Sequence, residues 1–202
     1  MKLMIASDIH GSAKYCAELI EAFVTEEADR LLLLGDILYH GPRNDLPEGY
    51  DPKAAARMLN DMAGSICAVR GNCDAEIDQT VLDFPIMADY ALILSGERMI
   101  FATHGHIHGP ELPPPMCEGA ILLCGHTHVP ACEEREGFTY CNPGSVSIPK
   151  DGSKRGYILL DGGSMIWKTL GGEEYMRYRI NKPAQPKVVT AIKEAIGRLS
   201  GK

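Results

Sequence analysis

Short apolar runs, each closed by Gly or a polar residue, dominate the first third of the chain. They cover residues 2–7, 30–34 and 65–69. Continuous runs of this length are typical of strands that are buried on both faces. Residues 12–27 carry apolar side chains every four positions, and residues 51–64 begin with Asp-Pro and end at Gly, so both segments predict helices. The alternation of strands and helices predicts a parallel α/β core.

The pattern changes after residue 90, where strand-like segments are joined by Gly-containing turns. Three such pairs predict β-hairpins, and one more apolar run predicts a buried strand at residues 120–124. The hairpins are expected at residues 90–103, 131–141 and 155–170. We expect residues 171–187 to form an irregular tail and a helix to follow near residues 188–199. The sequence therefore predicts an α/β protein with two packed sheets and helices outside them.

Composition is that of one soluble globular domain over residues 1–202, with 45% apolar and 23% charged residues. The formal net charge of -7 argues against a surface that binds nucleic acid. The N-terminal apolar stretch is too short for a signal peptide or a membrane span. Exposed edges of the predicted hairpins keep a homo-oligomer open as an alternative to a monomer.

Seven cysteines occur without any C-x-x-C spacing. We interpret them as reduced thiols in a cytoplasmic protein. Those within the apolar runs 65–69 and 121–125 are expected to pack as small hydrophobic side chains.

Metal-binding residue types follow five of the predicted strands. They are Asp8 and His10, Asp36, Asn72, His104, and His126 and His128. Ligand sites form where the carboxyl ends of strands meet, so these side chains are expected to converge. Two pairs lie two residues apart, which in an extended segment would point both side chains the same way. Carboxylate, imidazole and amide donors suit Mn²⁺, Fe²⁺ or Zn²⁺, and their number suits two ions that share one carboxylate.

The same motifs, in the same order, are found in a known family. The series Asp8-Ile9-His10, Gly35-Asp36, Gly71-Asn72-Cys73-Asp74, His104 and Gly125-His126-Thr127-His128 resembles the calcineurin-like metallophosphoesterases, whose pattern is D-x-H, G-D, G-N-H-[DE], H and G-H-x-H. The resemblance implies a four-layer α/β/β/α sandwich of two packed mixed sheets. It also implies two divalent ions, expected to be Mn²⁺, with Zn²⁺, Fe²⁺, Ni²⁺ or Co²⁺ as alternatives. The implied ligands are Asp8, His10 and His128 for one ion, Asn72, His104 and His126 for the other, and Asp36 for both.

One position departs from the family pattern. Cys73 stands where many relatives have a His that stabilises the scissile phosphate and protonates the leaving oxygen. A thiol with an ordinary pKa of about 8.5 is a poorer proton donor and cannot carry positive charge. The resemblance gives Asn72, Cys73 and His104 as catalytic candidates, whereas the role of Asp74, which would orient the missing His, is left open.

The resemblance implies a metal-dependent phosphodiesterase that attacks a small-molecule phosphodiester with a bridging hydroxide. The alternatives are a phosphomonoesterase, a protein or dinucleotide phosphatase, or a binding scaffold such as one subunit of the eukaryotic retromer coat. His40 and His106 could lie near the substrate and have no assigned role. Arg43 could bind substrate, but Arg43 and His108 are interpreted as solvated loop residues. The stretch NPGSV is interpreted as turn chemistry alone.

Overall fold

The computed structural model describes residues 1–180 and residue 198. Its first sheet has six strands in the order β11-β10-β9-β1-β2-β3. β1 lies inside this sheet, parallel to β2 and antiparallel to β9. The strands are β1 (Leu3–Ala6), β2 (Arg30–Leu33), β3 (Ile66–Ala68), β9 (Gly156–Asp161), β10 (Ser164–Thr169) and β11 (Glu174–Arg179).

The second sheet has five strands in the order β4-β5-β6-β8-β7. β5, β6 and β8 run parallel, whereas β4 and β7 are antiparallel edge strands of hairpins. The strands are β4 (Tyr90–Ser95), β5 (Arg98–Thr103), β6 (Ala120–Leu123), β7 (Pro130–Arg135) and β8 (Phe138–Pro143). The third predicted hairpin is formed by β9 and β10, which pair antiparallel in the first sheet, so all three hairpins are confirmed.

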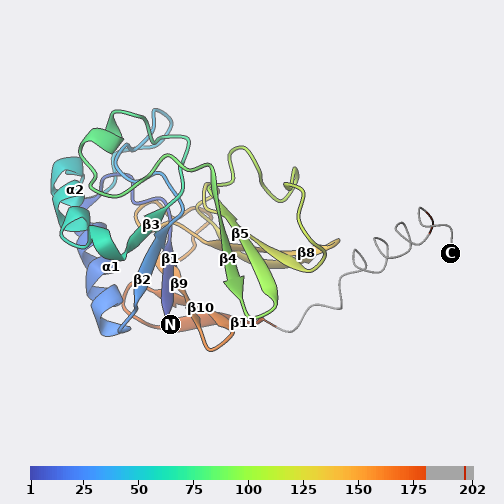
Figure 1. Cartoon of the computed structure of the whole chain (residues 1–202). Helices are drawn as coiled ribbons and strands as arrows, with labels where there is room; N and C mark the ends of the chain where they lie inside the picture. Colours follow the sequence, from blue (N-terminus) through green and yellow to red (C-terminus); the bar gives the residue numbers. More distant parts are fainter. Residues whose placement is uncertain (181–197, 199–202) are drawn as a thin grey trace.

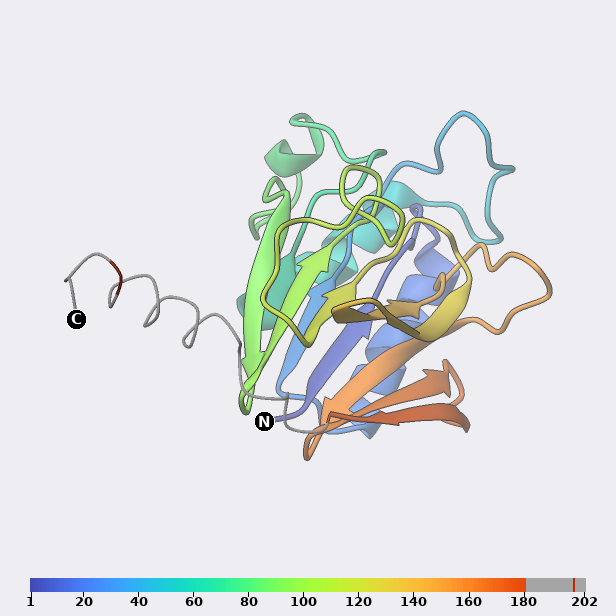
Figure 2. The same cartoon turned by 90° about the vertical axis from the view of Figure 1, so that its right-hand side faces the viewer.

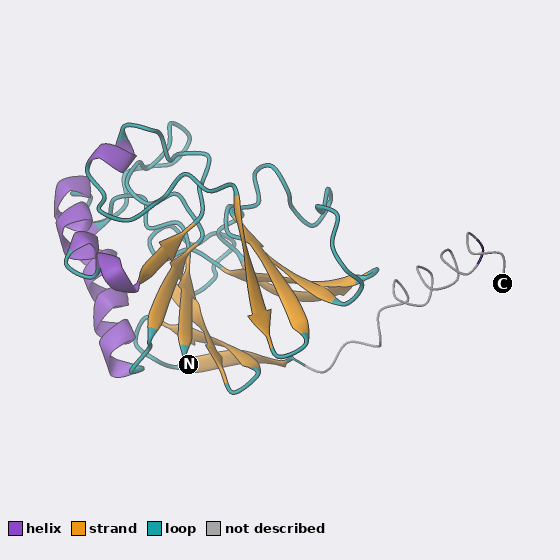
Figure 3. Cartoon of the chain, viewed as in Figure 1, coloured by secondary structure: helices purple, strands orange, loops and turns teal. Residues whose placement is uncertain are grey.

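Two helices cover the outer face of the first sheet (Figures 1 and 3). α1 (Ala13–Thr25) begins at Ser12, whose hydroxyl accepts a hydrogen bond from the N–H of Tyr15. α2 (Pro52–Asn60) begins at Asp51 with Pro52 at its first position, as the sequence indicated. It ends at Asn60 and not at the expected Gly64, because the chain there tightens into a short 3-10 turn at Ala63–Ser65.

The two faces of the first sheet bury two separate hydrophobic clusters. Alternate residues of β1 and β2, such as Met4 and Leu33, pack with the helices. The opposite face, including Ile5 and Leu32, packs against Ile121 of the second sheet. The two packed mixed sheets expected from the sequence are confirmed.

The outer face of the second sheet is covered by the loop between β5 and β6. Met116 from this loop packs on Phe101, Leu122 and Tyr140. The loop contains the run GPELPPP, and proline removes the backbone donors that a helix requires. Within the described part of the chain, the helical layer is therefore present on the first sheet only.

Two other expectations are wrong. Part of the predicted tail forms the strand β11. β11 lies at a solvated sheet edge and carries charged side chains, so it lacks the apolar run that marks a buried strand. Cys67 is exposed although its segment is apolar, because β3 is also an edge strand. The helix expected near residues 188–199 lies, except for residue 198, outside the described residues. None of the helices described has the length and apolarity needed to span a lipid bilayer.

Candidate metal centre

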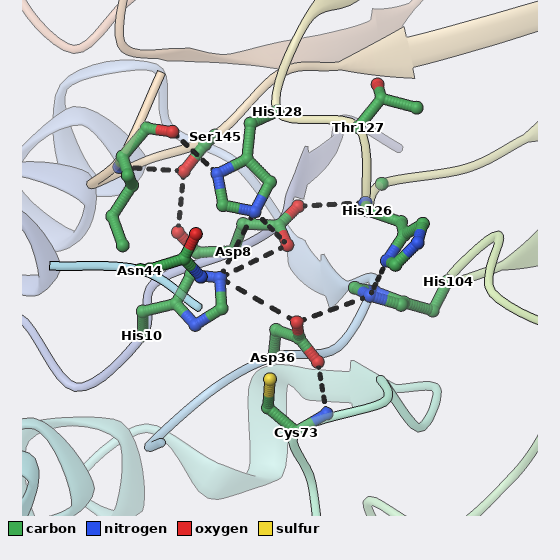
Figure 4. Close-up of polar contacts among 12 residues, drawn as sticks. Asp8, His10, Asp36, Asn44, Cys73, His104, His126, Thr127, His128 and Ser145 are labelled. Carbon is green, nitrogen blue, oxygen red and sulfur yellow. Dashed lines mark hydrogen bonds and ion pairs between the residues drawn. The ribbon is translucent and has the colours of Figure 1, made fainter. Parts of the chain in front are cut away.

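The loops after five strands meet at one end of the two sheets (Figure 2). β1, β2 and β3 of the first sheet end there, as do β5 and β6 of the second. Close approach is required at this meeting point: a Cβ added to Gly125 would lie 1.9 Å from the hydroxyl oxygen of Ser7. The packing of the sheets thus brings six of the seven predicted ligands into the cluster of Figure 4, and the seventh, Asn72, contacts His104 of that cluster.

Three of these side chains form a first group. The Nε2 atoms of His10 and His128 lie 3.3 Å apart. Asp8 Oδ1 is 3.5 Å from the first of these nitrogens and 3.3 Å from the second. All three side chains are buried, so no bulk water separates them.

A second group lies on the other side of Asp36. His104 Nε2 is 3.1 Å from Asn72 Oδ1 and 3.3 Å from His126 Nδ1. Asn72 contributes a neutral oxygen, which adds no negative charge next to the two buried carboxylates.

Asp36 stands between the two groups. Its Oδ2 atom is 3.7 Å from His10 Nε2 and 3.4 Å from His104 Nε2. Its Oδ1 atom accepts a hydrogen bond of 2.8 Å from the backbone N–H of Cys73. One carboxylate oxygen therefore faces donors of both groups while the other is held by the chain.

The imidazoles are oriented as metal ligands are. The Nδ1–H groups of His10, His104 and His128 donate to the carbonyls of Tyr39, Leu34 and Ile148 at 2.7, 2.6 and 2.6 Å. Each neutral ring then directs the lone pair of Nε2 into the cluster. The buried Oδ1 of Asp8 accepts no hydrogen bond from the protein. Lone pairs that face one another without a donor fit a bound cation.

Electrostatics lead to the same conclusion. Burial by itself would raise the pKa of Asp8, but His10 and His128 hold that pKa well below its ordinary value. Burial would likewise raise the pKa of Asp36, but its contact with His104 holds that pKa below its ordinary value. The two carboxylates thus stay ionised in a buried place, where an unpaired charge is costly and positive charge is favoured.

The ligands sit on strained turns and not on extended segments. Asp8, His10, Asp36, His126 and His128 have φ angles of 60°, 50°, 54°, 67° and 63°. Non-glycine residues rarely adopt this left-handed region, and such strain gathers at functional sites. The expectation that the residue pairs converge through an extended backbone is therefore wrong: turns bring them together.

Asp74, whose role the sequence left open, fixes the turn that carries Asp36. Its carboxylate accepts hydrogen bonds from the N–H groups of Asp36, Ile37 and Gly71 at 2.8, 2.8 and 2.7 Å. Gly71 makes this possible, because a Cβ there would lie 2.0 Å from Asp36 Oδ1. Asp74 thus positions a predicted ligand through the backbone.

The NPGSV stretch at residues 142–146 and the serine that follows it do more than turn the chain. Ser145 and Ser147 donate their hydroxyls to the carbonyl of Asp8 at 2.9 and 3.0 Å. Asn142 donates to the carbonyl of Gly125 at 2.7 Å. These contacts fix the turns that carry Asp8 and His126. Sequence analysis missed this role, since Ser and Asn in a Pro-Gly turn look like ordinary loop residues.

A cavity of about 470 Å³ opens in front of the cluster. Its lining includes Cys73, whose pKa is raised to about 12, first by burial and then by the nearby Asp36. The thiol is therefore neutral at physiological pH. Arg43, Asn44 and Lys150 also line the cavity.

The other histidines do not line this cavity. His40 packs edge-on against the rings of Tyr39 and Tyr50, at centroid distances of 4.7 and 5.3 Å. The ring of His106 packs beside that of His104, with 5.4 Å between the ring centroids. The ring of His108 packs edge-on against that of Phe101, with 6.3 Å between the ring centroids, and the residue is half-buried. Its interpretation as a solvated loop residue is therefore wrong.

Known proteins share this sequence and fold. The phosphodiesterase YfcE of Escherichia coli (strain K12) is 50% identical over 161 residues, which cover 80% of this chain and 88% of YfcE. The probable metallophosphoesterase YsnB of Bacillus subtilis (strain 168) is 32% identical over 105 residues, which cover 46% of this chain and 54% of YsnB.

Solved structures agree. That of the E. coli phosphoesterase YfcE matches with a TM-score of 0.86 and 45% identity, covering 90% of this chain and 100% of that one. Vps29 of Entamoeba histolytica, solved with zinc, shares the fold alone, with a TM-score of 0.58 and 19% identity over 90% of this chain and 100% of Vps29. Residues 1–164 match the calcineurin-like phosphoesterase superfamily domain. The chain therefore belongs to the calcineurin-like phosphoesterase superfamily.

Proposed function

We propose that this protein is a metal-dependent phosphodiesterase. The observation that carries the proposal is the buried cluster in which Asp8, Asp36 and the Nε2 atoms of three histidines face one another, with Asp8 Oδ1 accepting no hydrogen bond from the protein. The identity of 50% with the phosphodiesterase YfcE supports the same reaction class.

We propose that the cluster holds two divalent ions. Asp8, His10 and His128 would hold one ion, and Asn72, His104 and His126 the other. Asp36 would touch both, which the position of its Oδ2 atom between the two groups supports. Mn²⁺ is the first choice, with Zn²⁺, Fe²⁺, Ni²⁺ and Co²⁺ as alternatives, because imidazole and carboxylate donors suit all of them.

When bound, the ions would activate a water molecule at neutral pH and offset the negative charge on the phosphate. The chain itself would orient the ester in the cavity and exclude bulk water from the buried side. Cys73 lines the cavity as a neutral thiol, so it neither neutralises the phosphate nor readily gives a proton to the leaving oxygen. Diesters with good leaving groups are therefore expected to react fastest.

The test is hydrolysis of a chromogenic nitrophenyl phosphodiester by the chelated protein and after addition of each metal. We expect no activity after chelation, recovery with Mn²⁺, and two ions per chain by elemental analysis. The variant D36N should lose activity while remaining folded, whereas D51N, the same change at an exposed helix cap, should remain active. Full activity after exhaustive chelation, or a faster reaction with the corresponding monoester, would contradict the proposal.

We further propose a reducing, cytoplasmic location and self-association. Seven free thiols, of which Cys67 and Cys117 are exposed, suit a reducing compartment. β4 is an edge strand that exposes Tyr90, Leu92 and Leu94, so a second copy could cover it. Light scattering on the purified protein tests the oligomer, and the variant L94E should reduce the mass if this edge is the interface.

A further inference from the structure

The cavity in front of the cluster is larger than one phosphate needs. Its volume of about 470 Å³ lies in the range of pockets that enclose a whole small ligand. Its lining includes Asp36, His126 and His128 of the proposed metal centre. It also includes residues 41–44 and Lys150, which come from two separate loops and are not proposed ligands. These residues are available to the parts of a substrate that do not react.

Two positively charged side chains are part of this lining. The guanidinium of Arg43 and the ammonium of Lys150 have no ion-pair or hydrogen-bond partner among the described residues. In contrast, Lys14, Arg70 and Lys154 are each paired with an acidic side chain. In a protein with a net charge of -7, two unneutralised cations in one cavity form a local site of attraction for anions.

Both cations stand on backbone that is held by hydrogen bonds. The N–H of Lys150 donates to the carbonyl of His128 at 3.2 Å, and its own carbonyl accepts a hydrogen bond of 2.6 Å from Ser153. Arg43 lies in a turn closed by Asn44, whose side chain donates to the carbonyl of His40 at 2.8 Å. The bases of the two side chains are thus held in place before a ligand arrives.

The scissile phosphate does not account for these charges. On the proposed function, the two ions would already offset the negative charge of that phosphate. We propose that Arg43 and Lys150 form a subsite for a second anionic group, such as a phosphate or carboxylate carried by one of the two esterified alcohols. The substrate is then a phosphodiester with an additional anion, an inference that rests on the proposed function.

The test compares two diesters with one leaving group, ethyl p-nitrophenyl phosphate and 2-phosphonoethyl p-nitrophenyl phosphate, on the Mn²⁺-loaded protein. The phosphonate adds the second anion without adding another hydrolysable ester. We expect at least a tenfold higher kcat/KM for the phosphonate-bearing diester. In R43Q and in K150Q, the KM for the phosphonate-bearing diester should rise, so that the preference for this diester falls about tenfold. A change of this size corresponds to the loss of one charge-assisted hydrogen bond. The ethyl diester should change less than twofold.

K53Q is the matched control, because Lys53 is an exposed cation of α2 that does not line this cavity. It should leave both rates unchanged. Equal rates for the two diesters in the wild type, or equal losses on both in R43Q and K150Q, would overturn the subsite. If neither diester is hydrolysed, the proposed function fails. Binding of the phosphonate-bearing diester, measured by calorimetry, then tests the subsite. Weaker binding by both R43Q and K150Q supports the subsite, and unchanged binding refutes it.

Discussion

The substitution D74N tests whether one buried carboxylate positions the centre. Asp74 is 8% exposed and accepts three backbone N–H groups. In the variant, the amide oxygen can take the place of Oδ2 and keep the bonds from Asp36 and Gly71. The amide NH₂ then takes the place of Oδ1, and it cannot accept the hydrogen bond from the N–H of Ile37. Losing that charge-assisted bond costs about 2 kcal/mol. The other two become neutral bonds of about half the strength, which costs about 1 kcal/mol each.

The expected loss in the free energy of unfolding is therefore about 4 kcal/mol, measured by urea denaturation of the chelated protein. D51N is the control: Asp51 accepts a single N–H at an exposed helix cap, where Asn serves equally well. Because Asp74 holds the turn of Asp36, D74N should also weaken Mn²⁺ binding by about 10- to 100-fold. A loss no larger than that of D51N, or unchanged Mn²⁺ affinity, would refute this reasoning.

Four further changes have definite expected outcomes. G71A places a methyl group 2.0 Å from Asp36 Oδ1, so the amount of metal bound per chain, measured by titration, should fall. The control variant D51N should bind as much metal as the wild type. The pKa of about 12 predicts that iodoacetamide alkylates Cys73 far more slowly than the exposed Cys67 at pH 8, with the rate rising only as pH approaches that pKa. Cys73→His adds a group that can be protonated, so hydrolysis of diesters with poor leaving groups should increase relative to nitrophenyl esters; an unchanged ratio counts against our account of Cys73. E27G should stabilise the protein by about 0.5–1 kcal/mol in urea denaturation, because Glu27 follows α1 with φ 51° where glycine is preferred.

The strand ends were predictable because two signals coincide there. A buried strand needs a continuous apolar run, and a ligand needs a polar side chain directly after it, so Asp8, Asp36 and His104 stand out in the sequence. The pairing order of the strands was not predictable, since β6 pairs with β8 across the β7 hairpin and β1 pairs with the distant β9. Such contacts depend on how the two sheets pack and leave no local pattern.

Residues that support the centre through backbone atoms were missed for a related reason. Ser145 reaches the carbonyl of Asp8 across 137 positions of the chain, and no spacing rule covers that separation. Lys150 was missed likewise, because only the folded loop brings it to the cavity. Side chains that act through their own chemistry can be recognised in a sequence, whereas side chains that act through position become visible only in the structure.

The backbone of the ligand turns indicates how the centre is kept in place. Of the seven non-glycine residues with positive φ in the described chain, five are proposed ligands. Strain of this kind costs about 1–3 kcal/mol per residue and persists only where surrounding structure imposes it. Here the surroundings are the contacts of Gly125 with Ser7 and of Gly71 with Asp36, together with the bonds to Asp74. Each of these contacts joins two groups of the protein. We therefore expect the ligand turns to persist after chelation, so chelation should remove activity while the fold remains.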